Sequence, residues 1–190
     1  KVLAREAFDE QSAVTIEKVK LASPESLPGQ AGMLEYSYKA GVRVTPEIAN
    51  LMAMMREAGF DVWVITASFE GTVQAVSEPD AYGYDVPNDH VIGIRLKQDA
   101  DGKYLPEVDD SEGYAITYRK GKADVLRNLV GKAPIFAAGD SDTDFEMMTS
   151  FAETKMGLVV NRLKGGDIGS LYGMAVSDTP YTGRYLLQGR

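Results

Sequence analysis

Three short apolar runs, with helical patterns between them, constrain the fold of this chain more than any other feature. The runs are DVWVITAS at 61–68, APIFAAGD at 133–140 and MGLVVN at 156–161. Continuous apolar runs of this length are typical of strands that are buried on both faces of a parallel sheet. The order strand, helix, strand, repeated along the chain, therefore predicts an α/β fold with a doubly wound parallel sheet.

The helices between the runs have recognisable ends. Thr45 is positioned as an N-cap, Pro46 occupies the first helical position, and Gly59 follows the last apolar residue at helical spacing. A second helix is predicted within KGKADVLRNLVGK at 120–132, and a third begins at DTDFEMM at 142–148. Each predicted helix therefore precedes a predicted strand.

The rest of the chain is organised differently. Residues 1–42 predict a remnant of a helical cap or an arm, with a helix over 4–19, and residues 43–190 predict the α/β core. Within the core, residues 91–108 are apolar before and after Asp101-Gly102, a pair typical of tight turns. We expect this segment to form a β-hairpin that projects from the sheet as a flap.

Composition excludes several classes of function. A net charge of −8 over 190 residues argues against a nucleic-acid partner, because such proteins carry basic faces. No apolar run approaches the ~18 residues that a membrane helix needs, so no membrane partner is expected. With no cysteine and a single histidine, any metal must be held by oxygen.

Five polar side chains fall at or near the carboxyl ends of the predicted strands, where α/β sheets bind ligands. Thr66 and Ser68 end the first run, Asp140 ends the second, Asp144 follows one helical turn later, and Lys122 opens the preceding helix. Mg²⁺ prefers oxygen ligands and usually takes one or two carboxylates together with a substrate phosphate. We expect Asp140 and Asp144 to hold Mg²⁺, and Thr66 and Lys122 to bind the phosphoryl group of a small phosphomonoester. Ser68 is a candidate for a further phosphate contact, although its residue type favours a cap of the next helix.

Other polar and aromatic side chains have plainer interpretations. Asp142 is expected to cap the helix that it begins, and it is left out of the metal set. The tyrosines Tyr36, Tyr38, Tyr82 and Tyr84 have the chemistry of an aromatic cage for a quaternary ammonium group, but packing roles are favoured for them.

The stretches VITAS, GKADVL and GDSDTDFEM, in this order and spacing, resemble motifs II, III and IV of the haloacid dehalogenase superfamily. The resemblance implies a Mg²⁺-dependent phosphatase with a Rossmann-like three-layer α/β/α core. It makes Thr66 and Lys122 catalytic residues, and Asp140 and Asp144 the residues that hold Mg²⁺ directly or through water. The hairpin region and the GKADVL helix resemble the phosphoserine phosphatase branch. The segments AYGYDVPNDHVIGI and GLVVNR look closer to bacterial phosphorylcholine phosphatases, which are periplasmic; the lack of cysteine is compatible with that location.

One part of the superfamily pattern is absent. Motif I, Asp-x-Asp after an apolar strand, supplies the nucleophile and normally precedes motif II, but residues 1–60 contain no such pattern. Asp99 and Asp101 imitate it superficially, at the predicted hairpin turn between motifs II and III. We expect the chain to be the later part of a longer phosphatase that lacks its first strand and is inactive as given. The exposed sheet edge would pair with the missing segment or with a second copy.

Two other functions compete with the phosphatase. One is a non-catalytic module that binds Mg²⁺ and phosphate as a sensor or partner. The other is a receiver-type signalling domain, which also combines acids, a hydroxyl and a lysine. In receivers the acids come first, whereas here Thr66 and Lys122 precede Asp140 and Asp144, so the receiver is the weakest candidate.

Overall fold

The computed structural model describes residues 2–13, 15–22, 33–39, 44–177 and 183–188. The chain divides into two compact units, one formed by residues 1–62 and 74–87 and the other by residues 63–73 and 88–190. The residues that the sequence predicts for the functional site, Thr66, Ser68, Lys122, Asp140 and Asp144, all belong to the second unit.

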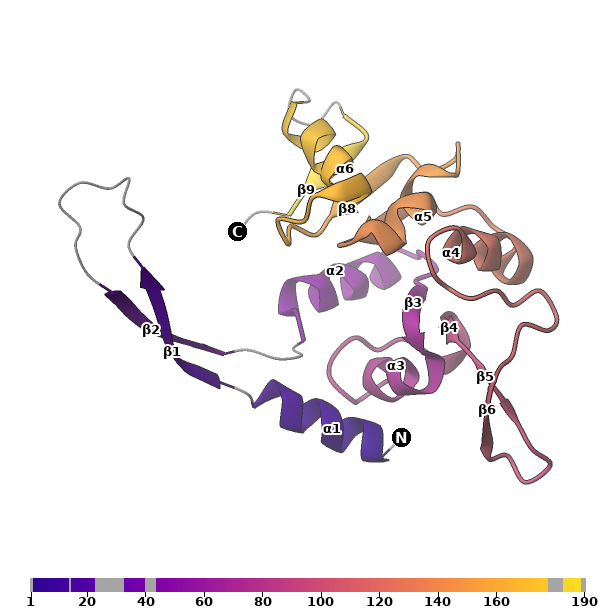
Figure 1. The fold of residues 1–190 in the computed structure, drawn as a ribbon. Coiled ribbons are helices and arrows are strands. Elements are labelled where there is room, and N and C mark those ends of the chain that lie inside the picture. The colour runs from indigo at the N-terminus through magenta and orange to yellow at the C-terminus, as the bar shows by residue number, and fades with distance from the viewer. Residues whose placement is uncertain (1, 14, 23–32, 40–43, 178–182, 189–190) are drawn as a thin grey trace. The chain divides into compact units, whose positions relative to one another are not determined.

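The first unit begins with helix α1, Val2–Ser12, followed by strand β1, Thr15–Ala22, and strand β2, Met33–Lys39. β1 and β2 pair antiparallel (Figure 1). The helix predicted over residues 4–19 is therefore right only up to Ser12. Thr15–Ala22 mixes β-branched and charged residues without strict alternation. Its strand is stabilised by hydrogen bonds to a partner strand, and the local residue pattern does not predict that partner.

Helix α2, Pro46–Glu57, follows the predicted rules at both ends. Thr45 is its N-cap with an extended backbone, and Pro46 occupies the first helical position. After the helix, Gly59 lies in the left-handed region with φ of 84°, and its N–H donates to the Arg56 carbonyl at 2.9 Å. The prediction of this helix from its capping residues is confirmed.

The second unit contains the parallel sheets. Strand β3, Val64–Phe69, pairs parallel with β4, Val91–Ile94, while β7, Phe136–Gly139, β8, Met156–Val159, and β9, Tyr185–Leu187, form a three-stranded parallel sheet in that order. The predicted α/β class with parallel strands is confirmed. Among the described strands, β3 pairs only with β4 and β7 only with β8, so each has an unpaired edge.

Helices connect these strands. They are α3, Glu70–Ser77; a 3₁₀ turn, Asn88–His90; α4, Lys120–Val125, continued by a π-helical turn, Leu126–Val130; a 3₁₀ turn, Asp142–Asp144; α5, Phe145–Thr149; and α6, Gly166–Ser177. Their apolar side chains pack with the sheet: Met148 of α5 and Leu171 of α6 are almost fully buried in one cluster with Ala137, Val159 and Tyr185 of the strands. This cluster fixes the loops that follow β7 and β8.

The hairpin is shorter than the sequence suggests. It consists of β5, Leu96–Gln98, and β6, Tyr104–Val108, whereas Val91–Ile94 is the separate strand β4 of the parallel sheet. Residues 91–93 are buried, which a projecting flap could not achieve.

The turn chemistry of the hairpin is as predicted. Oδ1 of Asp99 accepts hydrogen bonds from the N–H groups of Asp101 and Lys103, at 3.0 and 2.9 Å, and Gly102 has φ of 78°. The Asp99 and Asp101 pair is therefore turn chemistry.

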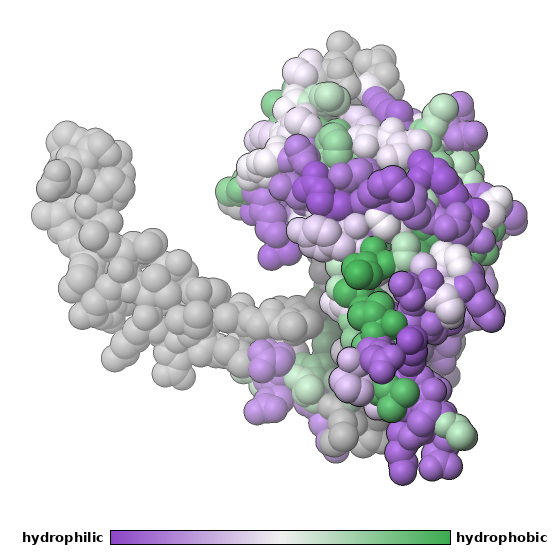
Figure 2. Space-filling view, turned by 45° about the vertical axis from the view of Figure 1, so that its right-hand side comes forward, coloured by the Kyte–Doolittle hydropathy of each residue, from purple (hydrophilic) through white to green (hydrophobic). Residues whose placement is uncertain are grey.

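Most of the face shown in Figure 2 is hydrophilic, with a small group of hydrophobic residues near its centre. Exposed apolar side chains elsewhere are ordinary for a folded surface. No helix among the described residues combines the length and the apolar character needed to cross a membrane.

Candidate active site

A buried ion pair joins motifs that lie far apart in the chain. Nζ of Lys122, at the start of α4, donates to Oδ1 of Asp144 at 2.6 Å and to the carbonyl oxygen of Ile65 in β3 at 2.8 Å. The two side chains are only 6% and 8% exposed. A buried lysine requires such partners, and here they bring together the end of β3, the start of α4 and the loop after β7.

The second oxygen of Asp144 organises the loop that contains it. Oδ2 accepts the N–H groups of Asp140 and Ser141, at 3.0 and 3.2 Å, and the Ser141 hydroxyl at 3.3 Å. Gly139 permits this close approach, because a Cβ there would lie 2.4 Å from the Cβ of Asp144. Both oxygens of Asp144 are therefore occupied by donors from the protein itself.

Thr66 lies in the same region, within β3 directly after Ile65; the strand continues to Phe69, beyond the end that the sequence predicts. Its Oγ1 accepts the N–H of Ser68 at 3.1 Å, and its carbonyl oxygen accepts the hydroxyl of Thr117 at 2.6 Å. Accepting one hydrogen bond does not consume the hydroxyl proton of Thr66, which can still be donated to a ligand. The Ser68 side chain is exposed, and its substrate-binding role stays a prediction.

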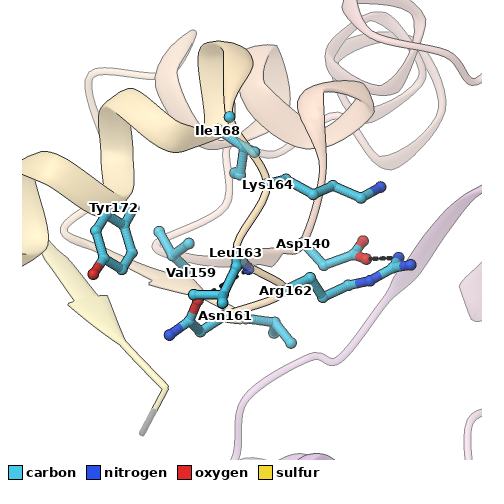
Figure 3. A pocket seen from close by; sticks show the side chains of 10 residues that line it. Asp140, Val159, Asn161, Arg162, Leu163, Lys164, Ile168 and Tyr172 are labelled. Atoms are coloured by element: carbon cyan, nitrogen blue, oxygen red, sulfur yellow. Dashed lines mark hydrogen bonds and ion pairs between the residues drawn. The ribbon is translucent and has the colours of Figure 1, made fainter. Parts of the chain in front are cut away.

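Asp140 has quite different surroundings from Asp144. It ends β7, its side chain is 34% exposed, and Oδ2 forms an ion pair with the 57% exposed Arg162. Figure 3 shows the carboxylate of Asp140 between the side chains of Arg162 and Lys164. The three residues line a pocket of about 310 Å³ that also includes Asn161, Ile168 and Tyr172.

The charges around Asp140 keep it ionised. Burial raises the pKa of its carboxyl, but the hydrogen bond and charge of Arg162 and the charge of Lys164 lower the pKa more, so that it lies below the ordinary value. Asp140 is therefore an anionic, partly exposed carboxylate at neutral pH.

Asp142 corrects one prediction. It does cap a helix, but the helix is α6 and not the one that it begins: Oδ1 of Asp142 accepts the N–H of Ile168 at 2.9 Å. Gly166 makes room, because a Cβ there would lie 2.4 Å from Oδ2 of Asp142. The N-cap of the local 3₁₀ turn is Ser141, which forms a capping box with Asp144.

A second buried carboxylate supports the end of β3. Glu70 accepts hydrogen bonds from the Gly93 N–H at 3.1 Å, from Nε of Arg95 at 3.2 Å and from the Tyr114 hydroxyl at 3.1 Å. Burial, with the nearby charge of Glu70, raises the pKa of Tyr114 to about 12. This network holds the residues directly after Ser68 against β4.

The residues present fit part of a magnesium site. Asp140 is ionised, partly exposed and at the carboxyl end of a parallel strand, so it suits Mg²⁺ as a ligand. Asp144 has no oxygen free of protein donors, so a direct ligand role for it remains a prediction, and its observed contacts orient the backbone that carries Asp140. Within the described residues, no three or more carboxylate or histidine side chains gather as a metal site.

The tyrosines considered for a choline cage have other contacts. Tyr82 packs on Phe8 with a ring centroid distance of 4.6 Å and donates to Asp9 at 2.7 Å, and the Tyr84 hydroxyl accepts the Thr45 N–H at 3.1 Å. The side chains of Tyr36 and Tyr38 lie outside the described part of the structure. The packing interpretation therefore holds for Tyr82 and Tyr84.

Sequence reasoning missed Arg162 and Lys164. A signal was available, because both follow β8, the strand next to β7, and the loops at the carboxyl ends of parallel strands meet at one edge of the sheet. The rule that points to Asp140 after the apolar run at 133–140 points equally to Arg162 and Lys164 after the run at 156–161.

Comparison with known proteins agrees with this geometry. Residues 12–149 match the family of haloacid dehalogenase-like hydrolases. The chain belongs to this family. The resemblance seen in the three motifs is confirmed at the level of the family.

Individual relatives are more distant. The chain is 31% identical over 137 residues to a phosphorylcholine phosphatase of Pseudomonas aeruginosa, covering 60% of this chain and 39% of the relative. It is similar in structure to a conserved functionally unknown protein from Anaerococcus prevotii, with a TM-score of 0.77 and 27% identity over 100% of this chain and 53% of that one. The chain thus spans about half or less of the length of these relatives.

Proposed function

We propose that this chain is the later part of a longer Mg²⁺-dependent phosphomonoesterase that acts on a small phosphorylated metabolite such as phosphorylcholine or phosphoserine. The observation that carries the proposal is the hydrogen-bonded link from Ile65 through Lys122 to Asp144, because it gathers three motifs at one edge of the parallel sheets. Family membership and the likeness to a phosphorylcholine phosphatase support it.

Each residue has a proposed role. Thr66 donates its hydroxyl to a phosphoryl oxygen, and Lys122 directs its remaining N–H toward the same group. Asp140 holds Mg²⁺, which when bound offsets the negative charge of the transferring phosphoryl group. Asp144 fixes Lys122 and the backbone of Asp140. Ser68 adds a hydrogen bond to the substrate.

The nucleophile is proposed to be an aspartate on a strand outside these 190 residues. The unpaired edges of β3 and β7 support this proposal, since a parallel strand between them would extend both described sheets into one. The three-layer core would then be complete, and the 190-residue chain alone would not turn over substrate. The alternative partner at these edges is a second copy of the chain.

The test is release of inorganic phosphate by the full-length protein, with and without Mg²⁺. The substrates are phosphorylcholine, phosphoserine and an aryl phosphate, and EDTA-sensitive hydrolysis of at least one is expected. If none is hydrolysed, the protein is the alternative, a non-catalytic module that binds Mg²⁺ and phosphate.

That alternative is favoured by the absence of an Asp-x-Asp after an apolar run within residues 1–60, ahead of the motif II resemblance. Reading the coding sequence upstream of Lys1 separates the two, because an apolar strand ending in Asp-x-Asp restores the enzyme. We also propose a periplasmic location, from resemblance alone, which cell fractionation would test.

A further inference from the structure

The pocket beside Asp140 carries more positive than negative charge. Of the side chains that line it, Asp140, Arg162 and Lys164 are charged, so one carboxylate faces two cations. The ion pair with Arg162 occupies one oxygen of Asp140, and Lys164 adds its charge from the other side (Figure 3). The charges therefore leave a surplus of about one positive charge, which favours an anionic group in the part of the pocket next to Arg162 and Lys164.

The loop that presents these cations is held in a defined conformation. Oδ1 of Asn161 accepts the N–H of Leu163 at 3.1 Å, and Leu163 has φ of 53°, in the left-handed region. At its far end the loop enters α6, whose first turn is capped by Asp142 at Ile168. Arg162 and Lys164 thus project from a loop that is anchored at both ends, which lowers the cost of ordering them around a ligand.

The lining suits an anionic group better than a quaternary ammonium. Recognition of choline requires several aromatic faces or an uncompensated carboxylate. Here the aromatic lining residue is Tyr172, and the carboxylate of Asp140 is already paired with Arg162. A guanidinium and an ammonium on one loop instead match a carboxylate or a second phosphate.

We propose that Arg162 and Lys164 form a subsite for a second anionic group of the substrate, so that the enzyme prefers phosphomonoesters of anionic alcohols over phosphorylcholine. This inference rests on the proposed function, because it places the leaving group of the ester in the pocket next to Asp140. It assigns substrate specificity to two residues of the loop after β8.

Binding without metal tests the subsite directly. In EDTA, isothermal titration of the full-length protein should give a dissociation constant about tenfold lower for 2-phosphoglycolate than for phosphorylcholine, the effect of one charge-assisted hydrogen bond. The double variant Arg162→Gln, Lys164→Gln should bring the two constants together. The matched control is Lys103→Gln, Lys132→Gln, which removes the same charge from exposed positions outside the pocket lining and should preserve the preference.

Turnover then separates this inference from the proposed function. With Mg²⁺, the ratio of kcat/KM for 2-phosphoglycolate over phosphorylcholine should fall about tenfold in the pocket double variant and remain unchanged in the control. Equal binding of the two esters by the wild type, or an equal fall in both double variants, overturns the subsite. If the subsite is overturned in either of these ways but an aryl phosphate is hydrolysed, the phosphatase proposal stands without the subsite. If no ester is hydrolysed but the binding preference depends on Arg162 and Lys164, the anion site stands and the phosphatase proposal fails.

Discussion

Two carboxylates four residues apart form ion pairs in opposite environments. Asp144 and Lys122 are buried, and every oxygen of the carboxylate has a protein donor, whereas Asp140 and Arg162 are partly exposed and border a pocket. A buried pair is expensive to break, while an exposed pair can exchange partners with little cost. The contrast shows that Asp144 organises the loop and supports the proposal that Asp140 is the carboxylate that binds the ligand.

The largest effect is expected from breaking the buried pair. Asp144→Ala leaves the Lys122 ammonium buried without its counter-charge, and it removes the acceptor of two backbone N–H groups. The free energy of unfolding, measured with urea, should fall by about 3–5 kcal/mol. Asp124→Ala, which removes helix-surface ion pairs with Lys120 and Arg127, should cost about 1 kcal/mol or less. Equal losses in the two variants would contradict the structural role of Asp144.

Asp140→Asn should have the opposite effects: a large loss of activity and little loss of stability. The full-length protein should lose its Mg²⁺-dependent hydrolysis, a fall in kcat of about 10²–10³-fold or more, because an amide is a poor substitute for an ionised ligand. Its free energy of unfolding should change by less than about 1 kcal/mol, since the pair with Arg162 is partly exposed. Retained activity would refute the metal assignment, and collapse of the fold would remove the contrast with Asp144.

A smaller effect on turnover is expected from Thr66, whose neighbours include the buried Lys122. Thr66→Ala removes the hydroxyl but keeps the β3 backbone whose carbonyl groups bind Thr117 and Lys122. Turnover should fall by about tenfold, the value of one hydrogen bond to a charged group. Thr66→Ser should restore most of it in the same steady-state assay. Loss of folding in the alanine variant, seen by circular dichroism, would mean that Thr66 is structural.

Asp142 lies between the two carboxylates in sequence and offers a test of intermediate size for stability. Asp142→Ala removes the cap of α6 and should lower the free energy of unfolding by about 1 kcal/mol. Asp142→Asn keeps an acceptor oxygen and should recover most of that loss in the same denaturation experiment. An unchanged alanine variant would show that the cap contributes nothing.

The smallest effect is expected in the dependence of unfolding free energy on acidic pH. The pKa of Asp140 lies below its ordinary value of 3.8, so its contribution to stability is present above that value and is lost as pH falls through the folded-state pKa. Between pH 5 and 2, unfolding free energies should therefore fall slightly more steeply for the wild type than for Asp140→Asn. Parallel curves would mean that Arg162 and Lys164 do not stabilise the ionised carboxyl.

Local rules predicted much of the fold. The helix at Pro46 was predicted from its capping residues, and the parallel strands from uninterrupted apolar runs, because both signals act within a few residues. The strand at Thr15–Ala22 was not predicted, and neither was the parallel strand at Val91–Ile94, which had been assigned to the hairpin. Each forms because a distant strand offers hydrogen bonds, and the sequence of one strand does not name its partner.

The sequence by itself determined the chemistry of this protein: which carboxylates, lysine and hydroxyl end its strands, and which family they represent. Only the tertiary structure decided what each carboxylate does. Asp140 and Asp144 have the same predicted role in the sequence, yet they meet Arg162 and Lys122 respectively, and Asp142 caps α6 rather than the helix that it begins. The physical reason is that burial and neighbouring charge set the role of a carboxylate, and both come from residues brought near it by folding.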